Sequence, residues 1–355
     1  MATKINDKLT PKENYLRLCR GEDIEYIPTQ TFFGPSINDE LPITPAGLCA
    51  PGMNRSKDSI PGSKTFFDDW GVEYISVPEA NGGALPVGTH TNEYLIKDIY
   101  KWRDYIRKPS RYDDIDWAAK AKEDLDKIDR NQTAVVCGCP LGPFQQLMAM
   151  IGFVDGLVAL YEEPEIMEEI LDYMLSYMEP HIQATIDHYN PDLFIIIDDT
   201  ATQRAPFISL NMFRELFMPA YKRIAKAANE RGLPMLYHNC GNCQVFLPDM
   251  IDLGVRYWDP AQTVNDLDNM QQTICREYNF NLVGGFNWVE PEGEVTEEYT
   301  RQLVRDYIDR WAPGGHFVAT GGVLGQLGDQ RAAQINAWIK DESYTYRREW
   351  MKKNG

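Results

Sequence analysis

The segment LPMLYHNCGNCQVFLPDM, residues 233–250, holds the pattern that decides the fold. It begins as an apolar strand, passes through the polar sequence His-Asn-Cys-Gly-Asn-Cys, and ends as the start of an amphipathic helix. A buried strand that leads into a helix through a short turn is the repeating unit of α/β folds. The same turn places a histidine and two cysteines where the strand ends, so the segment also raises the question of chemistry.

The alternation of strand and helix extends along the rest of the chain. The sequence predicts eight strands, at residues 26–33, 72–77, 133–138, 192–199, 234–240, 255–260, 280–286 and 316–322. Several are almost continuous apolar runs, as expected for parallel strands covered on both faces. Eight strands alternating with helices in 355 residues predict a TIM (β/α)8 barrel formed by one domain, residues 1–355. A doubly wound open sheet is the alternative.

Helix signals between the strands support this pattern. Residues 209–231 follow the capping residue Ser209, with Pro219 expected to kink the helix. Residues 164–188 and 296–311 are also periodic, and residues 11–20 predict an extra N-terminal helix. The stretch 42–64, rich in Pro, Gly and Ser, predicts a long loop after the first strand that is a candidate lid.

Composition limits the possible partners and the compartment. The formal net charge of −18 would repel phosphate backbones and anionic lipids, so we expect neither nucleic acid nor a membrane as partner. The longest strongly apolar run, residues 193–197, is too short to span a bilayer, and the N-terminus has no apolar signal region. Seven cysteines, an odd number, argue against a disulfide framework and favour a reducing cytoplasm.

In a barrel of this class the active site lies at the carboxyl ends of the strands. Those ends hold polar and sulfur-containing side chains, namely Cys137, Cys139, Asp198, Asp199, His238, Cys240, Cys243, Trp258, Asp259 and Gln262. Adjacent residues at a strand end point in opposite directions, so we expect only one of Asp198 and Asp199 to enter the mouth. Cys137 and Cys139 are expected to form part of the wall.

His238 and Cys240 lie two residues apart and therefore face the same side of a strand. An imidazole nitrogen and a thiolate presented together are natural zinc ligands. Cys243, expected in the first turn of the next helix, is the first candidate for a third ligand. Three ligands with an open fourth position are typical of catalytic zinc sites. The alternative is that these cysteines simply pack in the core.

Four segments then resemble the uroporphyrinogen decarboxylase superfamily, whose fold is a TIM barrel. They are LTPKENYLRLCRGEDIEYIP, IIIDDTATQRAPFISLNMFRELFMPAYKRI, HNCGNCQVFLPDMIDLGVRYWDPAQ and LVGGFN. The corrinoid-dependent methyltransferase branch is the more similar one. Decarboxylases of the family carry an arginine-rich segment after the first strand, whereas this chain has no arginine between Arg20 and Arg55. Methyltransferases of the family bind zinc through a His-x-Cys pair, which His238 and Cys240 match.

The resemblance implies a zinc-assisted methyltransferase that exchanges a methyl group between a small methylated substrate and the cobalt of a corrinoid (cobalamin) on a partner protein. The family's distal cysteine is absent from the turn at residues 319–325, which leaves Cys243, then Asp198, Asp199 or Glu290, as third ligand. This absence favours an O-demethylase-like role over methylation of coenzyme M. Asp198, Asp199 and Asp259 are candidate catalytic residues.

A pocket for a methylated substrate, such as an aromatic methyl ether, is expected near the rim of the barrel. Its candidate residues are Phe32, Phe33, Gln203, Trp258, Phe286 and Trp288. Packing in the core is the alternative for each aromatic residue. The alternative functions are a decarboxylase related to uroporphyrinogen decarboxylase and a non-catalytic binding protein on the same barrel.

Overall fold

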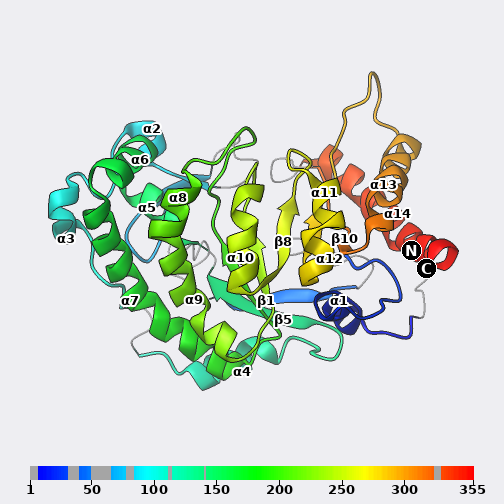
Figure 1. Ribbon diagram of the computed structural model, residues 1–355, viewed down its shortest axis with the longest axis horizontal. Helices are drawn as coiled ribbons and strands as arrows, with labels where there is room; N and C mark the ends of the chain where they lie inside the picture. Colours follow the sequence, from blue (N-terminus) through cyan, green and yellow to red (C-terminus); the bar gives the residue numbers. More distant parts are fainter. Residues whose placement is uncertain are drawn as a thin grey trace.

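A curled parallel sheet lies at the centre of the protein (Figure 1). The computed structural model describes residues 7–30, 40–48, 65–76, 84–110, 114–139, 141–323 and 329–355. Within these residues the sheet has seven strands in chain order: β1 (Ile43–Leu48), β5 (Ala134–Cys139), β6 (Leu193–Ile197), β7 (Met235–His238), β8 (Val255–Ala261), β9 (Asn281–Gly284) and β10 (Phe317–Val318). All neighbouring strands are parallel.

The α/β class and the parallel sheet confirm the predicted architecture in part. A single bridge between Thr29 and Ala319 extends the sheet beyond β10, and it is all that the described part of the predicted strand 26–33 contributes. No pairing between β1 and the Thr29 segment closes the sheet within the described ranges. The described structure is therefore a half-barrel rather than the closed eight-stranded barrel that the sequence predicted.

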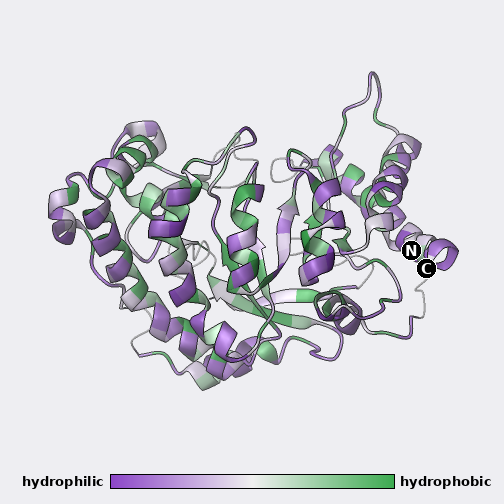
Figure 2. Cartoon of the chain, viewed as in Figure 1, coloured by the Kyte–Doolittle hydropathy of each residue, from purple (hydrophilic) through white to green (hydrophobic). Residues whose placement is uncertain are grey.

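Most helices cover the outer face of the sheet, whereas α1 (Pro11–Arg20) packs against residues inside its curl. The others are α2 (Gly88–Thr91), α3 (Trp102–Tyr105), α4 (Trp117–Leu125), α5 (Pro143–Ile151), α6 (Phe153–Glu162), α7 (Pro164–Tyr189), α8 (Leu210–Met212), α9 (Met218–Glu230), α10 (Leu247–Leu253), α11 (Leu267–Gln272), α12 (Ile274–Tyr278), α13 (Glu297–Trp311) and α14 (Gln330–Asn354). Figure 2 shows hydrophobic residues gathered on the central strands and hydrophilic residues on the outer helix faces. The predicted helices 11–20, 164–188 and 296–311 are confirmed, each with at most one residue of difference at an end.

Alternate strand residues face opposite sides of the sheet, as the pleat requires. On β6, Leu193, Ile195 and Ile197 pack with residues of α1 inside the curl of the sheet. Phe194 and Ile196 of the same strand pack outward against the helices. Since every strand obeys the same alternation, the side chains at each strand end point either into the curl of the sheet or outward to the helices.

The predicted strand 72–77 belongs to a separate antiparallel sheet, which corrects its assignment to the barrel. That sheet consists of β2 (Thr65–Phe67), β3 (Glu73–Ser76) and β4 (Ala84–Pro86). A tight turn causes this arrangement, because Asp68 N–H donates to Val72 O at 2.9 Å and Gly71 has a φ of +94°. A turn this short joins antiparallel neighbours, whereas parallel strands need a long crossover.

Strand β1 occupies part of the stretch 42–64 that the sequence predicted to be a loop. Pro45 and Gly47, which ordinarily weaken strands, hid it from the sequence pattern. Within the described sheet β1 pairs on one side only, with β5, and such an edge position tolerates proline. Residues 49–64, and with them most of the predicted lid, lie outside the described residues.

The predicted helix 209–231 forms with an internal irregularity. Ser209 caps α8 by accepting from Met212 N–H at 3.1 Å. A π-helical turn, Phe213–Phe217, then leads into α9, whose first turn contains Pro219. The wider turn precedes the proline, which lacks the N–H that a regular helix would use there.

None of the helices in the described ranges is, alone, long and apolar enough to cross a membrane, and only α5 and α6, taken together with a bend of 111°, reach that composition.

Asp68 fastens the small antiparallel sheet to the barrel. Its carboxylate accepts from Trp70 N–H at 2.9 Å, Val72 N–H at 2.8 Å and the Gln146 amide of α5 at 3.0 Å, with Tyr74 OH at 3.3 Å. Burial raises the pKa of Asp68 to about 6, even though these hydrogen bonds favour the charged form. The folded protein therefore keeps this proton at pH values where an unfolded chain has lost it.

This shift gives a pH dependence of known sign. Between about pH 4 and pH 6 the folded state binds more protons at Asp68 than the unfolded state, so stability falls as pH rises and the loss persists above pH 6. We expect the free energy of unfolding of the wild type, minus that of Asp68→Asn, to fall by about 2 kcal/mol between pH 4 and pH 7. Urea unfolding at a series of pH values measures it. Parallel profiles for the two proteins would contradict this origin.

Candidate metal centre

The register of three strands brings the predicted site residues to one level. Ile197 of β6 pairs with His238 of β7, and His238 pairs with Asp259 of β8. Residue 238 has the same parity as Leu236, which faces the inside of the curl. His238 and Cys240 therefore both face the mouth of the half-barrel, at the carboxyl ends of its strands.

Three potential ligand atoms meet at this point, from Asp199, His238 and Cys240. Within the described part of the chain these three residues form a group whose ligand atoms all lie within 4.8 Å of one another. The Cys240 Sγ lies 3.6 Å from His238 Nε2, which in turn is 4.0 Å from Asp199 Oδ1. Side-chain exposures of 20% for His238 and 33% for Asp199 leave the group open to solvent on one side.

This donor set fits zinc by its chemistry. Zinc takes imidazole nitrogen, thiolate sulfur and carboxylate oxygen, and its catalytic sites hold three protein ligands plus one open position. His238 and Cys240 come from the end of β7 and its following turn, and Asp199 comes from the end of β6. The three side chains would therefore hold a cation from one side and leave its other side open to solvent. Burial raises the pKa of the Cys240 thiol, so the free thiol keeps its proton and a bound cation would have to displace it.

Asp259 orients the imidazole. Its Oδ2 lies 3.0 Å from His238 Nδ1, and Nε2 is the ring nitrogen nearest Cys240 and Asp199. Burial alone would lower the pKa of His238, but the hydrogen bond with Asp259 and the neighbouring Cys240 raise it well above its usual value. The metal-free imidazole therefore also keeps a proton on Nε2, which a bound cation would have to displace. A carboxylate behind a ligand histidine is the common outer support of zinc sites.

Asp198 and Asp199 point in opposite directions, as the alternation of the strand demands. Asp198 is fully buried and faces the helices, where it accepts from Phe144 N–H at 2.9 Å, Gln145 N–H at 2.8 Å and Tyr221 OH at 2.8 Å. Burial raises the pKa of Asp198 to about 7. Asp198 thus anchors the start of α5, while Asp199 is the carboxylate that faces the mouth.

Backbone and amide groups hold Asp199 in place. Its Oδ1 accepts from Cys240 N–H at 2.7 Å, and its Oδ2 accepts from the Gln145 side-chain amide at 3.2 Å. Sequence reasoning missed Gln145. Its position two residues after Pro143, in the first turn of a helix that follows a strand end, is the signal that identifies it as a rim residue.

Cys243 lies apart from this group. Its thiol is fully buried and lies 3.4 Å from Asn239 O, in hydrogen-bond contact with it. Burial raises the pKa of Cys243 well above the usual value for a thiol. Glu290, which the sequence also offered as a candidate third ligand, pairs instead with Arg331 and with the Trp288 indole.

The turn that carries Cys240 is braced by amide side chains. Gly241 N–H donates to Gln262 Oε1 at 2.6 Å, and Asn265 Nδ2 donates to Gly241 O at 2.9 Å. Gly241 has a φ of +91°, and a Cβ there would lie 2.5 Å from Thr202 O, so the position requires glycine. The spacing of His238 and Cys240 is therefore fixed by the fold around them.

The structure places the remaining candidates in varied surroundings. Trp258 is fully buried between sheet and helices, where its indole N–H donates to Asn239 O at 3.1 Å. Phe286 lies against Tyr307 beside a small cavity near the end of β10, and Trp288 packs against Tyr299. Gln203 is exposed. Phe32 and Phe33 lie outside the described residues, as do residues 324–325 of the distal turn.

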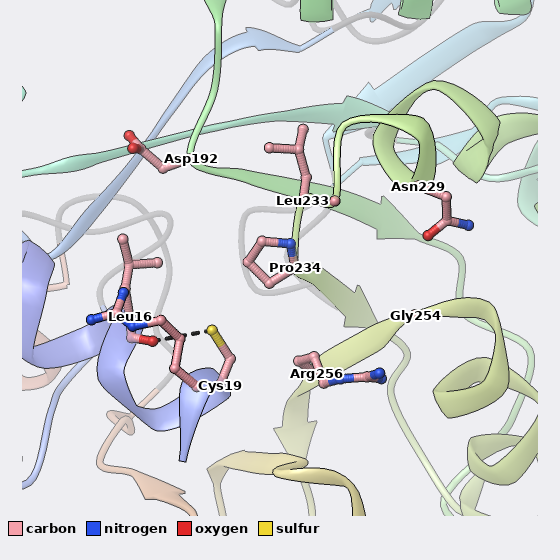
Figure 3. Close-up of a pocket in the computed structure, with 10 residues that line it drawn as sticks. Leu16, Cys19, Asp192, Asn229, Leu233, Pro234, Gly254 and Arg256 are labelled. Carbon is pink, nitrogen blue, oxygen red and sulfur yellow. Dashed lines mark hydrogen bonds between the residues drawn. The ribbon is translucent and has the colours of Figure 1, made fainter. Parts of the chain in front are cut away.

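A larger cavity, of about 450 Å³, lies at the opposite end of the strands (Figure 3). Leu16 and Cys19 of α1, Leu233 and Pro234 before β7, and Arg256 of β8 line it. In characterised TIM-barrel enzymes, residues at the amino ends of the strands contribute to stability, and the active site lies at the carboxyl ends. The chemistry-bearing side chains lie at the carboxyl ends, so we place the candidate site there.

Comparisons with known proteins agree with this architecture. The family model described as uroporphyrinogen decarboxylase (URO-D) matches residues 74–323, well over half of the chain. The solved structure of a methyltransferase from Methanosarcina mazei is similar with a TM-score of 0.63 and 15% sequence identity, over 97% of this chain and 99% of that one. The search of curated proteins found no match. From the family match across the site-bearing strands, the chain belongs to the uroporphyrinogen decarboxylase family.

Proposed function

We propose that this protein is a zinc-dependent methyltransferase. It would move a methyl group between a small methylated substrate and the cobalt of a corrinoid held by a partner protein. The grouping of Asp199, His238 and Cys240 at the mouth of the half-barrel carries the proposal. Membership of the family and the likeness in fold to a methyltransferase support it.

Asp199, rather than Cys243, would complete the ligand set. Its carboxylate already lies beside His238 Nε2, whereas the Cys243 thiol is buried against Asn239 O. When bound, zinc would supply a Lewis acid that polarises the atom bearing the methyl group. A carboxylate is a harder donor than a second thiolate, which suits a substrate that binds through oxygen, such as an aromatic methyl ether or methanol.

The chain's own residues would position these groups. Asp259 keeps a proton on His238 Nδ1, so that Nε2 is the ligand once a cation displaces the proton there. The Cys240 N–H and Gln145 amide fix the direction of the Asp199 carboxylate, and Gln262 fixes the turn below Cys240. A rigid site holds the methyl group in line with the incoming acceptor, an effect of orientation.

A methyl-transfer assay with free cob(I)alamin as acceptor tests this function. The donors would be a methoxylated phenol, methanol, methylamine and methanethiol, and the decay of Co(I) absorbance would report transfer. We expect transfer from an oxygen-bound methyl donor by zinc-loaded protein and none after the metal is removed by chelation. Failure with every donor, together with decarboxylation of uroporphyrinogen III, would overturn the proposal in favour of the decarboxylase.

Asp259→Ala should weaken the same site without removing a ligand. Loss of the partner of His238 Nδ1 frees the imidazole to rotate and to change tautomer. We expect zinc affinity and methyl-transfer activity to fall about 10- to 100-fold, the usual effect of removing an outer-shell carboxylate. Asp252→Ala, on the exposed side of α10, is the matched control. Equal behaviour of the two variants would show that Asp259 has no such role.

A further inference from the structure

Helix α6 presents an apolar face to solvent. Its residues Phe153, Val154, Val158 and Tyr161 are 39%, 75%, 47% and 66% exposed. Val154, Val158 and Tyr161 follow the i, i+4, i+7 spacing of a single helix face. A surface helix ordinarily turns polar residues outward, and a contiguous exposed apolar patch marks an interaction surface. We name these four residues the α6 face.

The α6 face lies at the same end of the sheet as the candidate metal centre. Helix α5 starts where β5 ends and is anchored by Asp198, beside Asp199. Helix α7, which follows α6, leads back to the start of β6, so α6 must lie at the carboxyl end of the strands (Figure 1). The Phe153 ring centroid lies 4.6 Å from that of Phe207, whose ring stacks on Phe144. Ring contacts therefore run from the α6 face to Phe144, whose backbone N–H donates to Asp198, the neighbour of Asp199.

Negative charge surrounds this face. Residues 131–203 contain twelve Asp and Glu but no Lys or Arg. Asp155, Glu162, Glu165 and Glu168 are exposed, and the described residues offer none of them an ion pair. The basic side chains nearby, such as Lys101 and Arg103, are already paired with other carboxylates. The face is an apolar centre with an acidic border.

We infer that the α6 face is the docking surface for the corrinoid-carrying protein, and this inference rests on the proposed function. The partner surface would have an apolar centre surrounded by Lys and Arg. A second copy of this chain would bring the same carboxylates to the border, and the two acidic borders would repel each other. The phosphates of nucleic acid or of an anionic membrane would likewise be repelled by the carboxylates around the α6 face. Opposite charges would also speed association in a salt-dependent manner.

The test compares two acceptors and two variants. Val158→Glu places a carboxylate at the centre of the α6 face. Tyr278→Glu is the matched control, since Tyr278 is 39% exposed at the end of α12, next to the amino end of β9 and therefore on the opposite side of the protein. The acceptors are free cob(I)alamin and the source organism's purified corrinoid proteins, each loaded with cobalamin and reduced, of which the one most active with wild type is used.

We expect Val158→Glu to raise the KM for the corrinoid protein at least tenfold, because a buried charge at an interface centre goes unpaired. Its rate with free cob(I)alamin should match wild type, and Tyr278→Glu should match wild type with both acceptors. Glu162→Lys should raise the KM severalfold and flatten its salt dependence.

Three results would overturn the inference. An unchanged KM in Val158→Glu, with normal transfer to both acceptors, would show that the partner docks elsewhere while the proposed function stands. Sedimentation showing a wild-type dimer that Val158→Glu dissociates would make the face a self-interface. Absence of transfer from wild type to free cob(I)alamin and to every corrinoid protein would refute the proposed function, and the docking surface with it.

Discussion

We expect Asp199→Ala to lower zinc affinity about as strongly as His238→Ala or Cys240→Ala, and Cys243→Ala to leave it nearly unchanged. The reason is geometric, since the ligand atoms of the first three residues lie within 4.8 Å of one another and the Cys243 thiol is buried against Asn239 O. A structural zinc site with four ligands binds with about 10–16 kcal/mol, so each lost ligand should cost roughly 10²- to 10³-fold in affinity. Methyl transfer should fall in parallel.

Competition with a chromophoric chelator measures these affinities for wild type and the four variants. Cys243→Ala is a matched control for Cys240→Ala, because it removes the same side chain three residues away. Tight zinc binding by Asp199→Ala, with loss of zinc from Cys243→Ala, would contradict the ligand set and return Cys243 to it.

Arg347→Ala destabilises the protein more than any other single change that we predict outside the metal centre. Arg347 of α14 is fully buried, where it bonds to Glu40 at 3.1 Å, to Ser343 O at 3.0 Å and to Ile27 O. Arg348 joins the same Glu40 carboxylate at 2.9 Å. The network ties the C-terminal helix to the segments before β1 and beside β10.

Removing one member of a buried ion network leaves its partner charged and poorly solvated. We expect Arg347→Ala to lower the free energy of unfolding by about 3–5 kcal/mol. Arg331→Ala, on the same helix but in an exposed pair with Glu290, should cost less than about 1 kcal/mol. Urea unfolding of both variants measures the difference. Equal costs would mean that burial of the network contributes nothing to stability.

The sequence could predict the parallel strands because their apolar runs are nearly continuous. It could also predict that His238 and Cys240 lie together at a strand end, where the structure adds Asp199 to them. The sequence did not predict strand β1, because Pro45 and Gly47 break the apolar pattern. Its pairing with β5 is a tertiary contact that no local signal encodes. The strand at 72–77 was misplaced because its identity depends on the turn at Asp68, which selects an antiparallel partner.

Strand parity explains which site residues share the mouth. Ile195 and Ile197 face inward on β6, so Asp199 faces inward and Asp198 outward. Tyr257 faces inward on β8, so Asp259 reaches His238 while Trp258 packs against the helices. Parity became usable only once the register was known, because it must be counted from a residue of known direction. The position of the Cys243 thiol depended on the path of the turn after Gly241, which parity does not reach.

The zinc K-edge X-ray absorption spectrum of the zinc-loaded protein tests the metal centre most directly. The ligand set of Asp199, His238 and Cys240 predicts one sulfur at about 2.3 Å and nitrogen or oxygen ligands at about 2.0–2.2 Å. A spectrum with two sulfur ligands would place Cys243 or another thiol at the metal. Failure of the protein to retain about one zinc per chain would contradict the metal centre altogether.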